Sequence, residues 1–164
     1  MGDIKVNEVK TDTIKSQSGT IYNFVKQAVS NKITESSASA DTRPSGNGAY
    51  TDTGLSQTIT PSSASSKILI LTCGLFYMRR IEEVRFRFMR DSTAIMTMPG
   101  YSETSDGFFT MPAPSGHLDS PNTTSAVTYK LQFYAQSNYT SLRFNYGGSA
   151  GLGEASMTLL EIAG

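Results

Sequence analysis

From residue 50 onward, apolar and polar side chains alternate with a period of two, which is typical of β-strands. Residues 83–91 alternate most strictly, with Val84, Phe86 and Phe88 on one predicted face and mostly charged residues on the other. Further strands are predicted at residues 53–60, 67–77, 93–98, 108–111, 127–136, 141–146 and 155–162. About eight short strands without intervening helices predict a mainly β fold, an antiparallel β-sandwich or jelly roll.

The period of the apolar residues changes before residue 50. Residues 3–15 alternate loosely and predict a short exposed strand or an extended arm. Between residues 20 and 29, apolar residues recur at intervals of three and four, which predicts a short amphipathic helix. The stripe consists of Ile21, Phe24, Val25, Ala28 and Val29. Residues 34–48 are small and polar and read as a linker.

These changes of pattern predict three regions. Residues 1–35 form an N-terminal anchoring arm with the short helix, residues 36–49 form a polar linker, and residues 50–164 form the β-jelly-roll head domain. No apolar run approaches the length of a membrane-spanning helix, so we expect no membrane insertion.

Two predicted strands, residues 67–77 and 155–162, are apolar on both faces. A strand in an antiparallel sandwich usually exposes one face to water, so the second apolar face needs a cover. The cover is either another copy of the domain or a helix or loop packed over the sheet in a monomer. We favour another copy as the more economical answer, because the chain offers no other cover than its single predicted N-terminal helix. The residues expected at the interface between copies are Ile68, Ile70, Leu159, Leu160 and Ile162.

Composition and charge exclude several classes of protein. The chain has 14 basic and 14 acidic residues, which argues against a nucleic-acid-binding protein. Ser and Thr make up about a quarter of the residues, while charged residues are only 17%, and this balance suits strands joined by polar turns. A single Cys and a single His exclude a disulfide within the chain and most metal sites. We therefore expect no metal and no cofactor.

The candidate catalytic groups do not converge on an active site. His117 is the only histidine and lies in a predicted Pro- and Gly-containing loop, and no Gly-x-Ser-x-Gly motif is present. Glu161 lies between apolar residues of the last predicted strand, and we expect it to pair with an arginine of a neighbouring strand or subunit. The chain is therefore predicted not to be an enzyme. A small glycan-active enzyme stays a minor alternative, since the sequence does not show which carboxylates pair in space.

Arginine and tyrosine suggest binding surfaces. Five of the seven arginines fall between residues 79 and 90. Arg85 and Arg87 share a face of their strand, which predicts either an anion-binding stripe or, as we favour, a solvated or salt-bridged face. No aromatic residue is interleaved on that face of the strand, which argues further against nucleic acid. Four tyrosines fall on loops or outward strand positions, as in a binding surface. They are Tyr101, Tyr134, Tyr139 and Tyr146.

Because binding residues concentrate on loops, we expect contacts with a receptor in the predicted loops 100–123, 137–140 and 147–153. The receptor-contact candidates are Tyr101, Phe108, Phe109, His117, Asn138, Tyr139 and Ser149. For Phe108 and Phe109, the alternative is that they only pin the long loop to the sandwich.

Three stretches of the head carry a resemblance to a known family. Residues 53–70 (Thr-Gly-Leu-Ser-Gln-Thr-Ile-Thr-Pro-Ser-Ser-Ala-Ser-Ser-Lys-Ile-Leu-Ile), 118–132 and 157–162 resemble jelly-roll modules of bacteriophage fibre and virion proteins, especially those of marine and cyanobacterial phages. Residues 4–14 resemble the strand motif at the start of many phage fibre proteins. The resemblance covers residues 50–164 well and residues 3–20 weakly. It implies a homotrimer similar to tumour-necrosis-factor-like domains, with the last strand near the threefold axis.

The same resemblance implies a non-enzymatic structural protein of the virion. We expect a short tail-fibre-type protein whose N-terminus docks on other tail or capsid proteins and whose head contacts host surface polysaccharide. The expected anchor residues are Ile4, Val6, Ile21, Phe24 and Val25. The alternative is a capsid-surface fibre or decoration protein with a purely architectural role.

Overall fold

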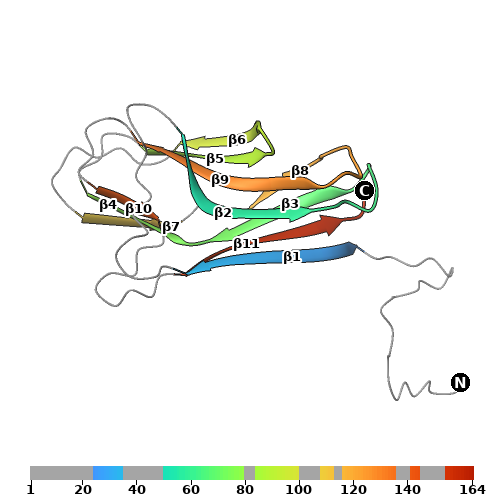
Figure 1. Cartoon of the computed structure of the whole chain (residues 1–164), viewed down its shortest axis with the longest axis horizontal. Coiled ribbons are helices and arrows are strands. Elements are labelled where there is room, and N and C mark those ends of the chain that lie inside the picture. Colours follow the sequence, from blue (N-terminus) through green and yellow to red (C-terminus); the bar gives the residue numbers. More distant parts are fainter. Residues whose placement is uncertain are drawn as a thin grey trace, which may run out of the picture.

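The computed structural model describes residues 24–34, 50–79, 84–99, 108–112, 116–135, 141–144 and 154–164, and every regular element among them is a strand (Figure 1). The strands are β1 (Val25–Thr34), β2 (Thr51–Ile59), β3 (Lys67–Cys73), β4 (Leu75–Arg79), β5 (Val84–Arg90), β6 (Thr93–Pro99), β7 (Phe108–Pro112), β8 (His117–Asp119), β9 (Val127–Ala135), β10 (Ser141–Phe144) and β11 (Glu154–Ile162). None of the described residues belongs to a helix that could cross a membrane.

Two four-stranded antiparallel sheets form a sandwich. One, the β11 sheet, has the order β1-β11-β3-β8, and the other, the β9 sheet, has the order β2-β9-β5-β6. A third sheet, β10-β4-β7, lies at one end of the sandwich (Figure 1). If the eight sandwich strands are numbered along the chain, the two orders are 1-8-3-6 and 2-7-4-5. This is jelly-roll connectivity, so the predicted mainly β fold is confirmed.

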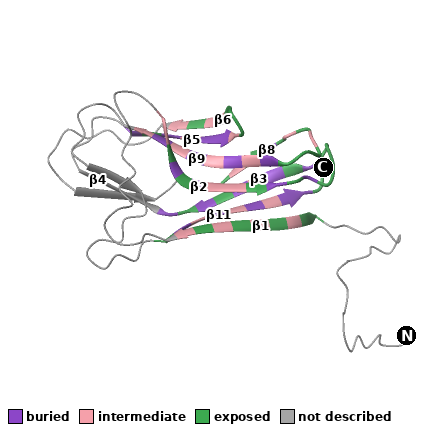
Figure 2. Ribbon diagram, in the orientation of Figure 1, coloured by how far each residue is buried: buried purple, intermediate pink, exposed green. Residues whose placement is uncertain are grey.

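The core lies between the two sheets. The β9 sheet contributes Phe86, Phe88 and Phe133, and the β11 sheet contributes Ile70 and Leu159, each buried to within 1% of complete. Buried and less buried residues alternate along β9 and β11 (Figure 2). The period of two in the sequence therefore corresponds to an inner and an outer face of each sheet.

Residues 25–34 form a strand, so the helix predicted at residues 20–29 is wrong in its described part, residues 24–29. β1 pairs with β11 along its length, with Ala28 opposite Leu160. Val29 and Ile33 pack against the core from its inner face. A spacing of four residues places two side chains on the same side of a helix and also on the same side of a strand, so the stripe did not distinguish the two.

β1 belongs to the sandwich, so the head domain includes residues 25–34. The predicted head domain, which begins at residue 50, leaves out this ten-residue strand. The predicted linker, residues 36–49, lies outside the described residues. The predicted strand 67–77 is also divided: β3 ends at Cys73, and β4 begins at Leu75 in the small end sheet.

The predicted interface between copies is wrong for three of its five residues. Ile68, Ile70 and Leu159 are fully buried inside the sandwich of a single chain, so they have no surface to offer a neighbour. Leu160 points to the outer face of the β11 sheet, since its strand neighbours Leu159 and Glu161 point inward. Ile162 is 8% exposed at the end of the same strand.

Candidate binding surface

The outer face of the β9 sheet carries a continuous group of aromatic and charged side chains. Register explains how it forms: Arg85 lies opposite Tyr134, and Gln132 lies opposite both Arg87 and Asp52. The strand neighbours of these residues point into the core, so these residues point outward. We call the group the Tyr–Arg surface. It consists of Tyr50, Asp52, Arg85, Arg87, Lys130, Gln132 and Tyr134.

Two tyrosines and two arginines contact one another at one end of this surface. The guanidinium carbon of Arg87 lies 3.8 Å from the ring centroid of Tyr50, and that of Arg85 lies 5.6 Å from the centroid of Tyr134. The two rings are 5.6 Å apart and inclined by 45°. These distances are those of cation–π and tilted aromatic pairs, so the four side chains support one another.

A chain of polar contacts holds Arg87 from the other side. Arg87 donates its Nε–H to Oε1 of Gln132 at 2.7 Å, and Nε2 of Gln132 donates to Oδ1 of Asp52. The ammonium of Lys130 lies 3.5 Å from Oδ2 of Asp52. Asp52 therefore holds the Gln132 amide, and the Gln132 amide in turn holds the guanidinium of Arg87.

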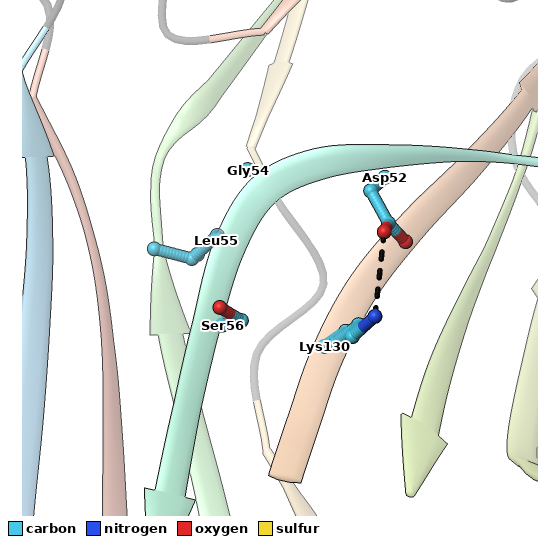
Figure 3. A pocket seen from close by; sticks show the side chains of 5 residues that line it. All are labelled: Asp52, Gly54, Leu55, Ser56 and Lys130. Atoms are coloured by element: carbon cyan, nitrogen blue, oxygen red, sulfur yellow. Dashed lines mark ion pairs between the residues drawn. The ribbon is translucent and has the colours of Figure 1, made fainter. Parts of the chain in front are cut away.

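A bulge in β2 forms a small pocket beside Asp52. Asp52 pairs with Gln132 and Ser56 pairs with Lys130, so three residues of β2 stand opposite one residue of β9. Gly54, in the middle of the bulge, has a φ of 84°, which favours glycine. Figure 3 shows β2 bending at Gly54, beside the side chains of Asp52 and Lys130. The pocket at this bend has a volume of about 110 Å³. Its lining residues are Asp52, Gly54, Leu55, Ser56 and Lys130.

The sequence predicted only part of this surface. The alternation of residues 83–91 placed Arg85 and Arg87 on one face, and Tyr134 was expected at an outward position. The aromatic partners were missed because they come from neighbouring segments rather than from β5 itself. Tyr50 could not be found from the pattern, since its place depends on the bulge in β2.

The predicted receptor-contact residues lie elsewhere or outside the described residues. Phe108 and Phe109 lie in β7, and His117 begins β8, so none of these three residues belongs to the β9 sheet. The loop prediction for His117 is wrong: the residue is half-buried and its ring stacks on Phe88, with centroids 6.3 Å apart. The other four candidates lie outside the described residues. They are Tyr101, Asn138, Tyr139 and Ser149.

Asp119 is a buried carboxylate, and protein side chains donate hydrogen bonds to both of its oxygens. Its oxygens accept hydrogen bonds from Nη1 of Arg90 at 3.1 and 2.9 Å and from the hydroxyl of Tyr129 at 2.7 Å. Burial, followed by the hydrogen bond to Asp119, raises the pKa of Tyr129 above its ordinary value, so this hydroxyl stays a donor. These hydrogen bonds link β8 of one sheet to β5 and β9 of the other sheet.

Glu161 is fully buried, and its expected arginine partner is wrong. Its carboxylate accepts hydrogen bonds from the Ser62 amide at 2.8 Å, the Ser62 hydroxyl at 2.6 Å and Nε2 of Gln27 at 2.7 Å. Burial alone would raise the pKa of Glu161, but hydrogen bonds from Ser62, Ser66 and Gln27 outweigh it and lower the pKa to about 2. The carboxylate therefore joins β1, β11 and the turn between β2 and β3.

The lowered pKa of Glu161 predicts a loss of stability in acid. In the unfolded chain Glu161 binds a proton below its ordinary pKa of 4.5, whereas in the folded chain it stays ionised until about pH 2. The stabilisation from the ionised carboxylate is therefore complete above pH 4.5 and disappears as the pH falls towards 2. The full difference corresponds to roughly 3 kcal/mol. Urea unfolding should show that Glu161→Gln loses less stability than the unmutated chain between pH 7 and pH 3.

The matched control is Glu154→Gln, which alters an exposed carboxylate of the same strand that pairs with Lys32 at 2.7 Å. We expect the pH dependence of this variant to follow that of the unmutated chain. Equal pH dependence in Glu161→Gln would contradict the assignment.

No group of three or more metal-ligating side chains lies close together in the part of the chain that the structure describes.

Comparison with known proteins gives similarity at the level of fold only. No family model matches the sequence, and no curated protein matches it. Solved structures of infectious bursal disease virus are similar to this chain: the Gt strain at 12% identity and TM-score 0.42, the Gx strain at 13% and 0.45, and the T13 particle at 13% and 0.42. These comparisons cover 100, 99 and 93% of this chain but only 43, 42 and 40% of the viral chains.

Proposed function

We propose that this chain is a non-enzymatic structural protein of a virion, of the tail-fibre type. In this proposal the jelly-roll head assembles as a homotrimer, the residues before β1 attach it to other virion proteins, and the head contacts polysaccharide on the host surface. The outer face of the β11 sheet is the observation that carries the proposal.

An apolar row crosses all four strands of that face. Cross-strand register places Ala28 beside Leu160, Leu160 beside Leu69, and Leu69 beside Leu118. Leu118 is 49% exposed, and Leu71, two residues along β3 from Leu69, is 39% exposed. A contiguous apolar face of this kind on a small domain marks an interaction surface.

Further copies of the same chain are the occupant that we propose for this face. The helix that could have covered it from within the chain is instead β1, a strand of the same sheet. Full burial of an exposed leucine side chain contributes ~1.5–3 kcal/mol. The leucines of this row are already partly buried, so each contributes a fraction of that value, and the stability of the assembly comes from several leucines in each of three copies. The last strand, β11, lies in the middle of the row, which agrees with a place near a threefold axis.

The resemblance of residues 53–70, 118–132 and 157–162 to phage fibre modules supports the placement in a virion. Jelly rolls also recur in viral capsid and lectin domains, which is an argument by analogy of fold. The contacts of Asp119 and Glu161 support a structural rather than a catalytic role, since protein donors surround both carboxylates.

Sedimentation and electron microscopy test the proposal. Analytical ultracentrifugation of the full chain at micromolar concentration should give the mass of a trimer. A stable monomer would contradict it. Immunogold labelling of intact particles should mark the tail; label on the capsid would instead support the alternative of a capsid-surface fibre or decoration protein.

A further inference from the structure

We propose that the Tyr–Arg surface binds an anionic saccharide, with the arginines holding the acidic substituent and the tyrosines contacting the sugar ring. This inference rests on the proposed function, because it supplies the site and the ligand class for contact with a host polysaccharide. It moves that contact from the predicted loops to the face of the β9 sheet.

Arg87 is prepared for an anion by its neighbours. Tyr50 lies under its guanidinium and Gln132 accepts its Nε–H, so two contacts fix the plane of the group before any ligand arrives. Among the described residues, the two η nitrogens of Arg87 have no hydrogen-bond partner. A guanidinium held in this way can donate two parallel hydrogen bonds to a carboxylate, sulfate or phosphate ester with little further loss of entropy.

The charge of the surface favours an anion. Arg87 and Lys130 are cations of this surface, and Arg85 adds a further positive charge beside Tyr134. Asp52 accepts a hydrogen bond from Gln132 and lies 3.5 Å from the ammonium of Lys130. The guanidinium of Arg87, which lies against Tyr50, is therefore the group of this surface that is placed to meet an anion.

The tyrosines suit a sugar ring. Tyr134 is half-buried and Arg85 is exposed, so their side chains remain reachable from solvent. A tyrosine ring offers an apolar face to the C–H groups of a sugar and a hydroxyl to its polar edge, and it loses little conformational entropy in doing so. The outer face of a sheet can hold such rings and polar groups in fixed positions.

The pocket at the β2 bulge limits the size of what enters it. A volume of about 110 Å³ is well below the 300–1,000 Å³ typical of sites that enclose a whole small ligand. It could accept one substituent, such as a hydroxymethyl or acetyl group, beside Asp52 and Lys130. A chain lying along the β9 sheet would thus be read mainly on its surface, which suits weak binding repeated in each copy of a trimer.

A saccharide fits these observations better than nucleic acid does. Nucleic-acid binding draws most of its affinity from many phosphate contacts, whereas this surface has three cations. The rings and hydroxyls of Tyr50 and Tyr134 instead match a ligand that has both C–H faces and hydroxyl groups.

Binding of the full chain to defined polymers tests the inference. The probes are polygalacturonate, which carries carboxylates, dextran sulfate, which carries sulfate esters, and uncharged dextran, all measured by biolayer interferometry. We expect binding to polygalacturonate or dextran sulfate and not to dextran, and the stronger of the two identifies the acidic group. Arg87→Gln and Tyr134→Ala should each weaken binding by about ten-fold or more.

Lys26→Gln is the matched control, since it removes one exposed positive charge from the β11 sheet. It should leave binding unchanged. Equal losses in Lys26→Gln and Arg87→Gln, equal binding to dextran, or tighter binding to oligo(dT) than to either acidic polymer would each overturn the inference. Circular dichroism and sedimentation of every variant keep the two proposals apart: an intact trimer without saccharide binding rejects this site alone, whereas a monomer that binds saccharide rejects the trimer alone.

Discussion

A chain that starts at residue 49 is expected to aggregate or remain unfolded, although it contains the whole head domain that the sequence pattern predicts. The deletion removes β1, and β11 then loses the partner that pairs with it from Val25 to Thr34. The apolar inner face of β1, with Val29 and Ile33, would leave the core, and Glu161 would lose its hydrogen bond from Gln27.

Together these losses should amount to at least ~4 kcal/mol, a large part of the 5–15 kcal/mol that holds a domain of this size together. An unpaired β11 also presents a long apolar edge, which favours aggregation. Solubility after expression, followed by thermal unfolding monitored by circular dichroism, measures the effect.

A chain that starts at residue 23 is the matched control. It keeps β1 and also the Phe24 carbonyl, which accepts a hydrogen bond from the Ala163 amide at 2.9 Å. This shorter deletion should leave the unfolding temperature within a few degrees of that of the full chain. If the chain from residue 49 folds equally well, β1 is not required by the sandwich.

The sequence was sufficient for the strands of the head because each has one face in a common core. The alternation of Val84, Phe86 and Phe88 with charged residues has only one interpretation, since a helix would mix the two groups. Residues 25–34 were different because Val25, Val29 and Ile33 recur at intervals of four, which fits either element. Residues 25–34 form a strand rather than a helix because the edge of β11 offers them a continuous line of hydrogen-bond partners.

The Tyr–Arg surface was also predicted only in part from the sequence. Strand alternation placed Arg87 on an outer face, but only the register between β9, β5 and β2 brings Gln132 and Asp52 beside it. That register depends on a bulge at Gly54, and no local pattern marks the bulge as different from an ordinary turn glycine. Binding surfaces on sheet faces are therefore harder to predict from sequence than the faces themselves.

Two substitutions that the sequence pattern treats alike should have opposite consequences. Ile70 is fully buried between the sheets, whereas Leu160 lies in the apolar row on the outer face of the β11 sheet. Ile70→Asp places a carboxylate in the core without a partner, which costs more than ~4 kcal/mol and should leave no folded protein. Leu160→Asp should leave the sandwich folded and separate the proposed trimer into monomers.

Circular dichroism and analytical ultracentrifugation of the same samples distinguish the two effects. Leu160→Asp should keep the β-sheet spectrum of the unmutated chain and sediment as a monomer. The introduced carboxylates would repel one another around the proposed threefold axis, whereas in the monomer each carboxylate lies among leucines that are exposed to water. Ser156→Asp is the control, since it adds the same charge at an outward position of β11 four residues from Leu160, between Lys32 and Cys73 and outside the apolar row. A trimer in Leu160→Asp would show that the outer face of the β11 sheet is not the surface between copies, and the assembly would then have to use another face of the jelly roll.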